Sequence, residues 1–179
     1  MTAIESQDDT PRIALVVSRY NESVTGALRH AAREAFLQRT GALEGLVEID
    51  APGSFELVAI AAAAAETGAF DGVVALGCLI HGDTWHDRYI AQGVTRGLVD
   101  LGLATGLPIG FGLLTCETAD QAHQRAGGTH GNKGADAMHA CLDTLQQVIA
   151  LHEAAERGQM PASLPLGSTV GDKAAPGDA

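Results

Sequence analysis

Four short apolar segments, each followed by a longer stretch with helical periodicity, are the feature that most constrains the fold. The first segment, residues 13–17, is uninterrupted by polar side chains and is β-branched at three of its five positions. Runs of this kind are typical of strands buried on both faces. The other predicted strands are 46–49, 72–79 and 108–114, and the predicted helices are 24–39, 55–67, 85–104, 118–126 and 135–157. Apolar strands joined by helical crossovers predict an α/β, doubly wound fold with a four-stranded parallel sheet and helices on both faces.

Several residues at the predicted helix ends favour these boundaries. Gly41 and Gly68 follow the last periodic residues of two helices, where glycine is common because it adopts the left-handed conformation. Ser54 and Thr118 precede helices and are predicted N-caps. The segment 127–134 is glycine-rich, and no strand or helix is predicted in it.

Polar and aromatic side chains collect directly after each predicted strand. Tyr20 and Asn21 follow the first, residues 54–56 the second, 78–86 the third and 115–117 the fourth. In open α/β sheets, ligands bind beyond the carboxyl ends of the strands. The pattern therefore predicts a site at this edge of the sheet, without indicating which reaction occurs there.

Five segments, in this order and spacing, resemble the lumazine synthase family over roughly residues 12–150. They are Ser18-Arg19-Tyr20-Asn21, residues 52–57, residues 77–86, residues 111–115, and Arg125-Ala126-Gly127 followed by residues 131–134. The resemblance implies a flavodoxin-like three-layer sandwich. It also implies condensation of 5-amino-6-(D-ribitylamino)uracil with 3,4-dihydroxy-2-butanone 4-phosphate in riboflavin biosynthesis, without a metal or a redox cofactor. Members of the family assemble as pentamers, some of them into sixty-subunit shells, with each site at a subunit boundary.

The resemblance implies that one group of residues holds the pyrimidine ring and its ribityl chain. Tyr20 would stack on the ring, although the family usually has Phe there, and a flat apolar face suits a heteroaromatic substrate. The group is Tyr20, Ser54, Phe55, Glu56, Cys78, Leu79, Ile80 and Phe111. The alternatives are an ordinary loop tyrosine for Tyr20, a glutamate that complements the helix dipole for Glu56, and a core residue for Phe111. Cys78 is interpreted as a buried structural thiol whose backbone contacts the ring.

A second group is implied to bind the phosphate of the four-carbon substrate. Gly82-Asp83-Thr84 precedes a helix, and exposed N–H groups at a helix start bind anions. The carboxylate of Asp83 has the same charge as the phosphate, so its backbone rather than its side chain should face the anion. Arg125, from the neighbouring subunit, and Lys133 would supply cations; outside the resemblance, both would be surface charges. The sequence contains neither GxxxxGK[ST] nor GxGxxG.

His86 is the candidate for proton transfer. Schiff-base formation, loss of phosphate and ring closure all move protons near neutral pH, where imidazole is well suited. A solvated or capping histidine is the alternative. His81 and His86 are five residues apart, a spacing that does not place two ligands on one helical face, so a zinc site is rejected.

Four positions around His86 depart from the family's pattern. Asp87 and Arg88 stand where the family usually has an aromatic residue and then an acid, His81 where it often has Arg or Lys, and Gly93 where a Glu is common. Because the five matching segments keep their order and spacing, the main hypothesis is an active lumazine synthase. The alternative is a weakened paralogue that binds flavin or lumazine, or serves as an oligomeric scaffold. A nucleotide-binding flavodoxin is a distant third hypothesis, because a Ser/Thr-rich loop is missing after the first strand.

Charge and cysteine usage bear on partners and location. The formal net charge of −11 argues against nucleic acid and anionic membranes as partners. Three cysteines without a CxxC pair indicate reduced, buried thiols, and the N-terminus does not resemble a signal peptide, so we expect a cytoplasmic protein. We predict a flexible arm (1–11), one lumazine synthase domain (12–157) and a disordered tail (158–179). The polar arm is poor strand material, which favours a homopentamer over a shell.

Overall fold

The computed structural model describes residues 10–166, and the chain divides near residue 145 into two compact units. Parts of the predicted arm (1–9) and of the predicted tail (167–179) lie outside the described residues. In chain order the elements are β1 (Ile13–Ser18), α1 (Glu22–Thr40), β2 (Leu46–Ala51), α2 (Leu57–Glu66), β3 (Gly72–Ile80), α3 (His86–Thr105), β4 (Ile109–Cys116), α4 (Ala119–Gln124), β5 (Ala126–Gly128), β6 (Gly131–Asn132) and α5 (Lys133–Glu156). Each predicted strand and helix is present, with ends within two residues of the predicted ones.

The main sheet has four parallel strands in the order β2-β1-β3-β4. This is the flavodoxin-like order, and it confirms the predicted fold. All six residues of β1 and the first seven of β3 are buried, as their unbroken apolar runs indicate. The strand order reverses direction between β1 and β3, so the connections that leave these two strands diverge to opposite faces.

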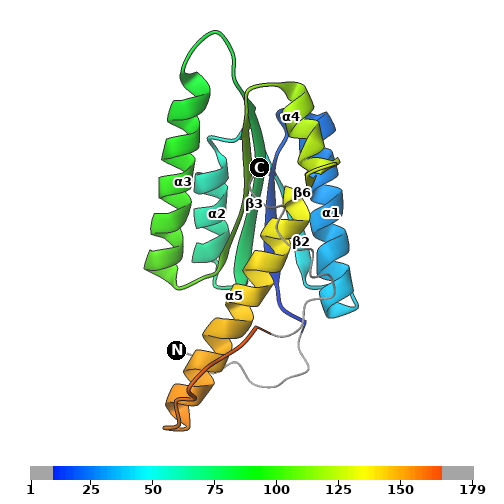
Figure 1. Ribbon diagram of the computed structural model, residues 1–179. Helices are drawn as coiled ribbons and strands as arrows, with labels where there is room; N and C mark the ends of the chain where they lie inside the picture. Colours follow the sequence, from blue (N-terminus) through cyan, green and yellow to red (C-terminus); the bar gives the residue numbers. More distant parts are fainter. Residues whose placement is uncertain (1–9, 167–179) are drawn as a thin grey trace. The chain divides into compact units, whose positions relative to one another are not determined.

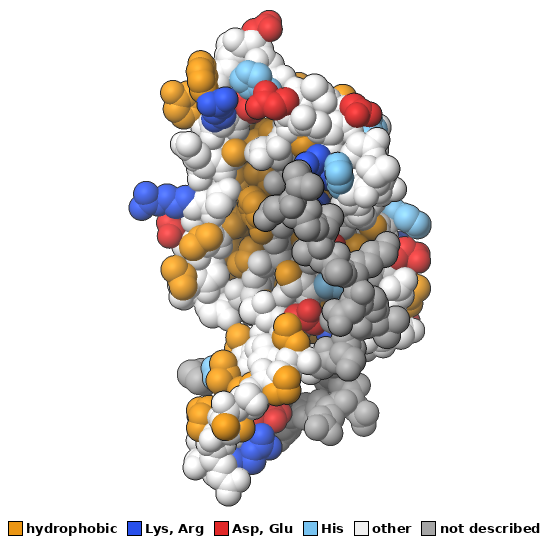
Figure 2. All heavy atoms as spheres, viewed as in Figure 1, with side chains coloured by type: hydrophobic (Ala, Val, Ile, Leu, Met, Phe, Trp, Pro, Cys, Tyr) orange, Lys and Arg blue, Asp and Glu red, His pale blue; other side chains and the backbone are white. Residues whose placement is uncertain are grey.

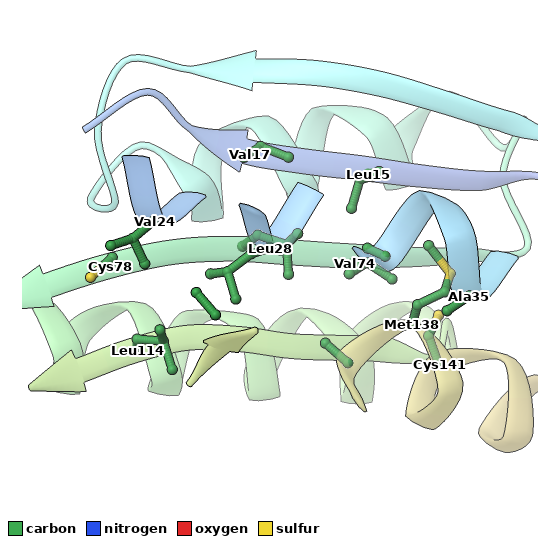
Figure 3. Close-up of a cluster of buried hydrophobic side chains, with 14 of the residues drawn as sticks. Leu15, Val17, Val24, Leu28, Ala35, Val74, Cys78, Leu114, Met138 and Cys141 are labelled. Carbon is green, nitrogen blue, oxygen red and sulfur yellow. The ribbon is translucent and has the colours of Figure 1, made fainter. Parts of the chain in front are cut away.

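Helices cover both faces of the sheet, α2 and α3 on one and α1, α4 and the first part of α5 on the other (Figure 1). Figure 3 shows the buried layer between the sheet and the helices α1 and α5, where Leu15 and Val74 of the strands meet Leu28 of α1 and Met138 of α5. Alternate residues of each strand supply the opposite layer, because successive side chains in a strand point to opposite faces. The two layers hold the strand ends, and therefore the loops beyond them, in place.

Three of the predicted helix ends are confirmed and one is wrong. Gly41 and Gly68 both adopt positive φ angles, of 78° and 64°. Thr118 caps α4 by accepting a hydrogen bond from the Gln121 N–H at 3.2 Å. Ser54 does not cap α2, which begins later, after Glu56, and its hydroxyl forms no cap hydrogen bond.

Part of the glycine-rich segment 127–134, in which no strand is predicted from the sequence, forms a strand pair. β5 and β6 form a small antiparallel pair, with Gly127 and Gly131 at φ angles of 119° and 75°. Glycine permits this tight reversal, but its lack of a side chain also removes the alternating pattern by which strands are recognised. Across residues 10–166, no helix is long and apolar enough to cross a membrane.

Candidate active site

A hollow of about 450 Å³ lies at the carboxyl ends of β1, β2 and β3, beside the point where the strand order reverses. This is the position at which open α/β sheets bind ligands. The loop from β3 to α3, drawn in green at the top of Figure 1, forms one wall. The lining residues are Tyr20, Asn21, Gly53–Glu56, Cys78–Ile80, Gly82, Thr84, His86, Asp87 and Ile90. The predicted site is therefore largely brought together in one unit of the chain.

Two aromatic side chains stand open to the hollow. Tyr20 follows β1 and is 72% exposed, and Phe55 follows β2 and is 65% exposed. Large apolar groups left in contact with water on a concave surface mark a ligand site. Both residues were predicted to contact a substrate ring, and their location at the hollow suits that role.

Asn21 lines the hollow although it is not among the residues predicted for the site. Its side-chain Nδ2 donates to the carbonyl oxygen of Cys78 at 2.9 Å, which joins the end of β1 to the end of β3. Its backbone φ of 57° lies in the left-handed region, which asparagine tolerates better than most residues. A polar residue directly after a buried strand was the signal that could have identified it.

The segment after β2 contributes a buried hydroxyl and a carboxylate. Ser54 is 5% exposed, and its Oγ has no hydrogen-bond partner within the part of the chain that the structure describes. Glu56 is half-buried, and its carboxylate lies over Gly53, where a Cβ would come within 2.9 Å of Oε2. Glycine at 53 therefore leaves the space in which the acceptor of Glu56 sits.

The Cys78 thiol is in no state to act as a nucleophile. Burial, with a smaller contribution from Cys116, raises its pKa to about 12. The pKa of Cys116 is also raised by burial, against the opposing effect of Arg125. All three cysteines are free and buried, as predicted. The thiol of Cys78 therefore stays protonated at neutral pH. Leu79 and Ile80, the next two residues of the chain, are half-buried apolar residues on the same wall of the hollow.

The loop from β3 to α3 presents free backbone groups at a helix start. Gly82, Asp83 and Thr84 are exposed, but only Gly82 and Thr84 line the hollow. The N-cap of α3 is Trp85, which forms no side-chain cap hydrogen bond, so the first N–H groups of this helix are open to an anion. His86 begins α3, is exposed and lines the same hollow.

Three of the four residues that depart from the family's pattern, His81, Asp87 and Arg88, lie at the ends of this loop. Asp87 lines the hollow and is hydrogen-bonded to His81. Arg88 lies over the ring of Trp85, with its guanidinium carbon 4.0 Å from the ring centroid. Gly93 lies further along α3 with no neighbouring atom within 4 Å of where its Cβ would be, so it alters no contact in this chain.

Besides Asp83, three residues predicted for the site do not line the hollow. Phe111 lies on the edge strand β4 and is 46% exposed. Arg125 and Lys133 are brought together by the β5–β6 pair, because the backbone N–H of Lys133 donates to the carbonyl of Arg125 at 2.9 Å. The Lys133 ammonium is paired with Asp136 at 2.7 Å. Phe111 is part of β4, and Arg125 and Lys133 follow β4 in the chain.

Within residues 10–166, no group of three or more His, Cys, Asp or Glu side chains is placed to hold a metal ion. The hollow offers apolar ring faces, hydrogen-bonding groups, a helix start and one imidazole. Together with the flavodoxin-like sheet, this arrangement defines an α/β protein that binds a small molecule at the topological switch point.

Comparison with known proteins gives the family. A family model described as 6,7-dimethyl-8-ribityllumazine synthase matches residues 10–148. A 6,7-dimethyl-8-ribityllumazine synthase of Deinococcus radiodurans is 42% identical over 133 residues, which cover 74% of this chain and 86% of the relative. The 6,7-dimethyl-8-ribityllumazine synthase 1 of Caulobacter vibrioides is 41% identical over 143 residues, 80% of this chain and 94% of the relative.

The chain belongs to the 6,7-dimethyl-8-ribityllumazine synthase family. It is, as its sequence predicts, a transferase of riboflavin biosynthesis, and these matches do not favour the alternative of a non-catalytic paralogue.

Proposed function

We propose that the hollow beyond β1, β2 and β3 is the site of condensation between 5-amino-6-(D-ribitylamino)uracil and 3,4-dihydroxy-2-butanone 4-phosphate. The observation that carries this proposal is the coincidence of two exposed aromatic side chains, Tyr20 and Phe55, with an open helix start on one hollow of about 450 Å³. A flat ring and an anionic chain are the two features that these substrates present. The exposed aromatic side chains suit the flat ring, and the open helix start suits the anionic chain.

The pyrimidine and the ribityl chain would occupy the side of the hollow nearest β1 and β2. Tyr20 stacks on the ring, and backbone groups of residues 78–80 contact its polar edge. The Glu56 carboxylate accepts hydrogen bonds from ribityl hydroxyls, and the unpartnered Ser54 hydroxyl is a further polar group on this wall.

The phosphate would bind at the start of α3. Backbone N–H groups around Gly82 and Thr84 donate to its oxygens, and the helix dipole favours its charge. Asp83 does not line the hollow, so its carboxylate, which has the same charge as the phosphate, does not border the proposed phosphate position.

His86 would move protons during the reaction. The substrate amine attacks the ketone and water leaves to form the imine; phosphate is then eliminated, and ring closure expels a second water. Each step requires a proton to be given or taken at a nitrogen or an oxygen. An exposed imidazole on the wall beside the turn at residues 82–84, here called the phosphate turn, can both give and take a proton.

Phe111, Arg125 and Lys133 would complete the hollow of a neighbouring copy. They do not line the hollow of their own chain, and Phe111 belongs to β4, an edge strand of the sheet. Hydrophobic side chains lie over β4 and α3 in Figure 2, and the exposed ones include Val99, Leu103 and Phe111. An exposed apolar stretch of this kind supports burial between subunits.

A homopentamer and a cytoplasmic location are part of the proposal. Three free, buried cysteines suit a reducing compartment. Light scattering that gave a particle near a megadalton would replace the pentamer by a shell, and fractionation of the native cell would test the location.

The first experiment measures lumazine fluorescence after the protein is mixed with both substrates, corrected for the uncatalysed reaction. Catalysed formation is expected, and His86→Ala should lower kcat by about 100-fold, the usual contribution of a general acid or base. The matched control is His30→Ala, because His30 is exposed on α1 and does not line the hollow. No acceleration by a folded oligomer would sink the proposed function, and an unchanged kcat in His86→Ala would make His86 a structural residue.

Shared sites can be tested by mixing subunits. His86→Ala and Arg125→Ala variants should each be nearly inactive. If each site takes His86 from one subunit and Arg125 from the next, an equal mixture refolded together should regain about a quarter of wild-type activity, one half times one half. Activity that did not exceed the average of the two variants would place both residues in the same subunit's site.

A further inference from the structure

Two of the residues that depart from the family's pattern contact each other across the phosphate turn. The ring nitrogen Nδ1 of His81 lies 3.1 Å and 3.2 Å from the two carboxylate oxygens of Asp87. His81 directly follows β3, and Asp87 is in the first turn of α3. The pair therefore joins the two ends of the loop that holds Gly82, Asp83 and Thr84.

Both members of the pair are held by the fold. The backbone N–H of His81 donates to the carbonyl of Cys116 in β4 at 2.8 Å, which fixes it to the sheet. The Asp87 side chain is only 16% exposed, and Asp87 lines the hollow. Its carboxylate is thus a partly buried charge in the wall beside the proposed phosphate position.

The charge of Asp87 opposes the binding of an anion unless it is compensated. A carboxylate near a phosphate repels it, and the repulsion is larger where water is partly excluded. A protonated His81 cancels this charge. A neutral His81 that carries its proton on Nδ1 keeps the hydrogen bond but leaves the negative charge in place. The geometry of the pair therefore survives the titration of the imidazole, whereas its net charge does not.

Other charged groups lie on the elements that hold this pair. Asp83 and His86 belong to the same loop and helix start, and Glu117 follows Cys116 at the end of β4. Arg125, at the end of α4, is close enough to Cys116 to lower its pKa against the effect of burial. These groups are the same in the wild type and in variants of His81, so a comparison between such variants isolates the charge of position 81.

We propose that His81 is a positioning residue that neutralises Asp87, and that the site binds its phosphate substrate more tightly when His81 is protonated. The inference rests on the proposed function of the hollow and adds a dependence on pH that is built from two residues of this chain. The test compares pH 6 with pH 8, because imidazole is the side-chain type that can change its charge across this range.

The fluorescence of Trp85 provides a probe of anion binding for this test. Trp85 is the single tryptophan, it lies at the N-cap of α3 directly after the turn, and it is 60% exposed. Its fluorescence can report an anion that binds at residues 82–84. Sulfate is the suitable probe because it stays a dianion between pH 6 and pH 8, whereas phosphate changes its own charge.

The experiment titrates sulfate into the full-length oligomer at pH 6 and at pH 8 and follows Trp85 fluorescence. In the wild type the dissociation constant should rise by about fivefold from pH 6 to pH 8, on the order expected for one nearby charge in partly aqueous surroundings. H81R keeps a cation at both pH values, and its pH 8 to pH 6 ratio should fall well below the wild-type ratio. Asp87→Asn removes the negative charge itself, so at pH 8 it should bind sulfate about fivefold more tightly than the wild type does.

Asp100→Asn is the matched control, because Asp100 is an exposed acid of α3 that pairs with Arg96 rather than with His81. It should keep the wild-type ratio. Light scattering and circular dichroism would establish that each variant keeps its oligomer and its fold. Should one of the two pair variants fail to fold, the other still provides the comparison.

The inference is overturned if H81R, when folded, keeps the wild-type ratio, or if Asp87→Asn, when folded, binds sulfate no more tightly than the wild type at pH 8. It is also overturned if sulfate leaves Trp85 fluorescence unchanged at pH 6 in the folded wild type. The turnover assay distinguishes this failure from failure of the proposed function. Turnover with an unchanged sulfate ratio removes only the role of His81, whereas the expected sulfate ratios without turnover remove only the proposed reaction.

Discussion

Gly134→Ala should destabilise the protein through a contact between α5 and α1. Gly134 is the second residue of α5 and is buried. A Cβ built on it would lie 2.6 Å from the carbonyl carbon and 2.8 Å from the Cα of Leu28, whose side chain is fully buried in the layer that α1 forms on the sheet. These are backbone atoms, so no rotation of a side chain can relieve the overlap.

The expected magnitude combines two opposing effects. Alanine is favoured over glycine inside a helix by about 1 kcal/mol. Forcing a methyl group into a packed backbone contact costs about 3 kcal/mol, the upper part of the usual range for overpacking. The net loss in the free energy of unfolding is therefore about 2 kcal/mol. In a chain of this size that loss lowers Tm by about 4–8 °C.

Gly26→Ala is the matched control. Gly26 lies in α1, is exposed, and has no atom within 4 Å of where its Cβ would be. Here the helix preference acts alone, so the free energy of unfolding should rise by about 1 kcal/mol. Urea unfolding of both variants at one protein concentration measures the difference. If Gly134→Ala were as stable as the wild type, the close packing of α5 on α1 would be refuted.

The remaining predictions concern a helix cap and the buried thiols. Thr118→Ala should lower the free energy of unfolding by about 1 kcal/mol because it removes the acceptor of the Gln121 N–H, while Thr118→Ser should keep most of it; thermal melting at fixed concentration would show which holds. Iodoacetamide at pH 8 should leave Cys78 and Cys141 unmodified in the native protein and modify them after unfolding in urea, as read by mass spectrometry; rapid native labelling of Cys78 would contradict its burial. Burial raises the pKa of Cys141 from its usual 9.0 to about 12, so its stabilising contribution is complete below pH 9 and is lost as the pH rises toward 12; Cys141→Ala should reduce the decline in unfolding free energy between pH 9 and pH 11.

The order and type of the large elements could be predicted because their signals are local. The unbroken apolar run of β1 and the 3.6-residue spacing of α1 are written in consecutive residues. The β5–β6 pair was missed because Gly127 and Gly131 have no side chains that could alternate between two faces. Ser54 was assigned as a cap because it precedes a helix in a suitable order, but two further residues separate it from the first turn of α2.

The position of the candidate site followed from the pattern alone, whereas its residue roles came from the resemblance. Polar residues after each strand predict the edge at which the hollow lies, since parallel strands end at the same side of the sheet. Asn21 was not selected because its partner, the Cys78 carbonyl, is distant in sequence. Phe111, Arg125 and Lys133 were predicted for the same site, yet the chain does not bring them to its own hollow.

The sequence by itself determined which segments are strands and helices, which faces are buried, and the edge of the sheet that carries the site, since each depends on the spacing of residues close together in the chain. The tertiary structure decided which distant groups meet. Among these are the link from Asn21 to Cys78, the juxtaposition of Gly134 with the Leu28 backbone, and the pairing of His81 with Asp87 across the turn. Such contacts depend on strand order and on the angles at which helices leave the sheet, and no local pattern of residues encodes either.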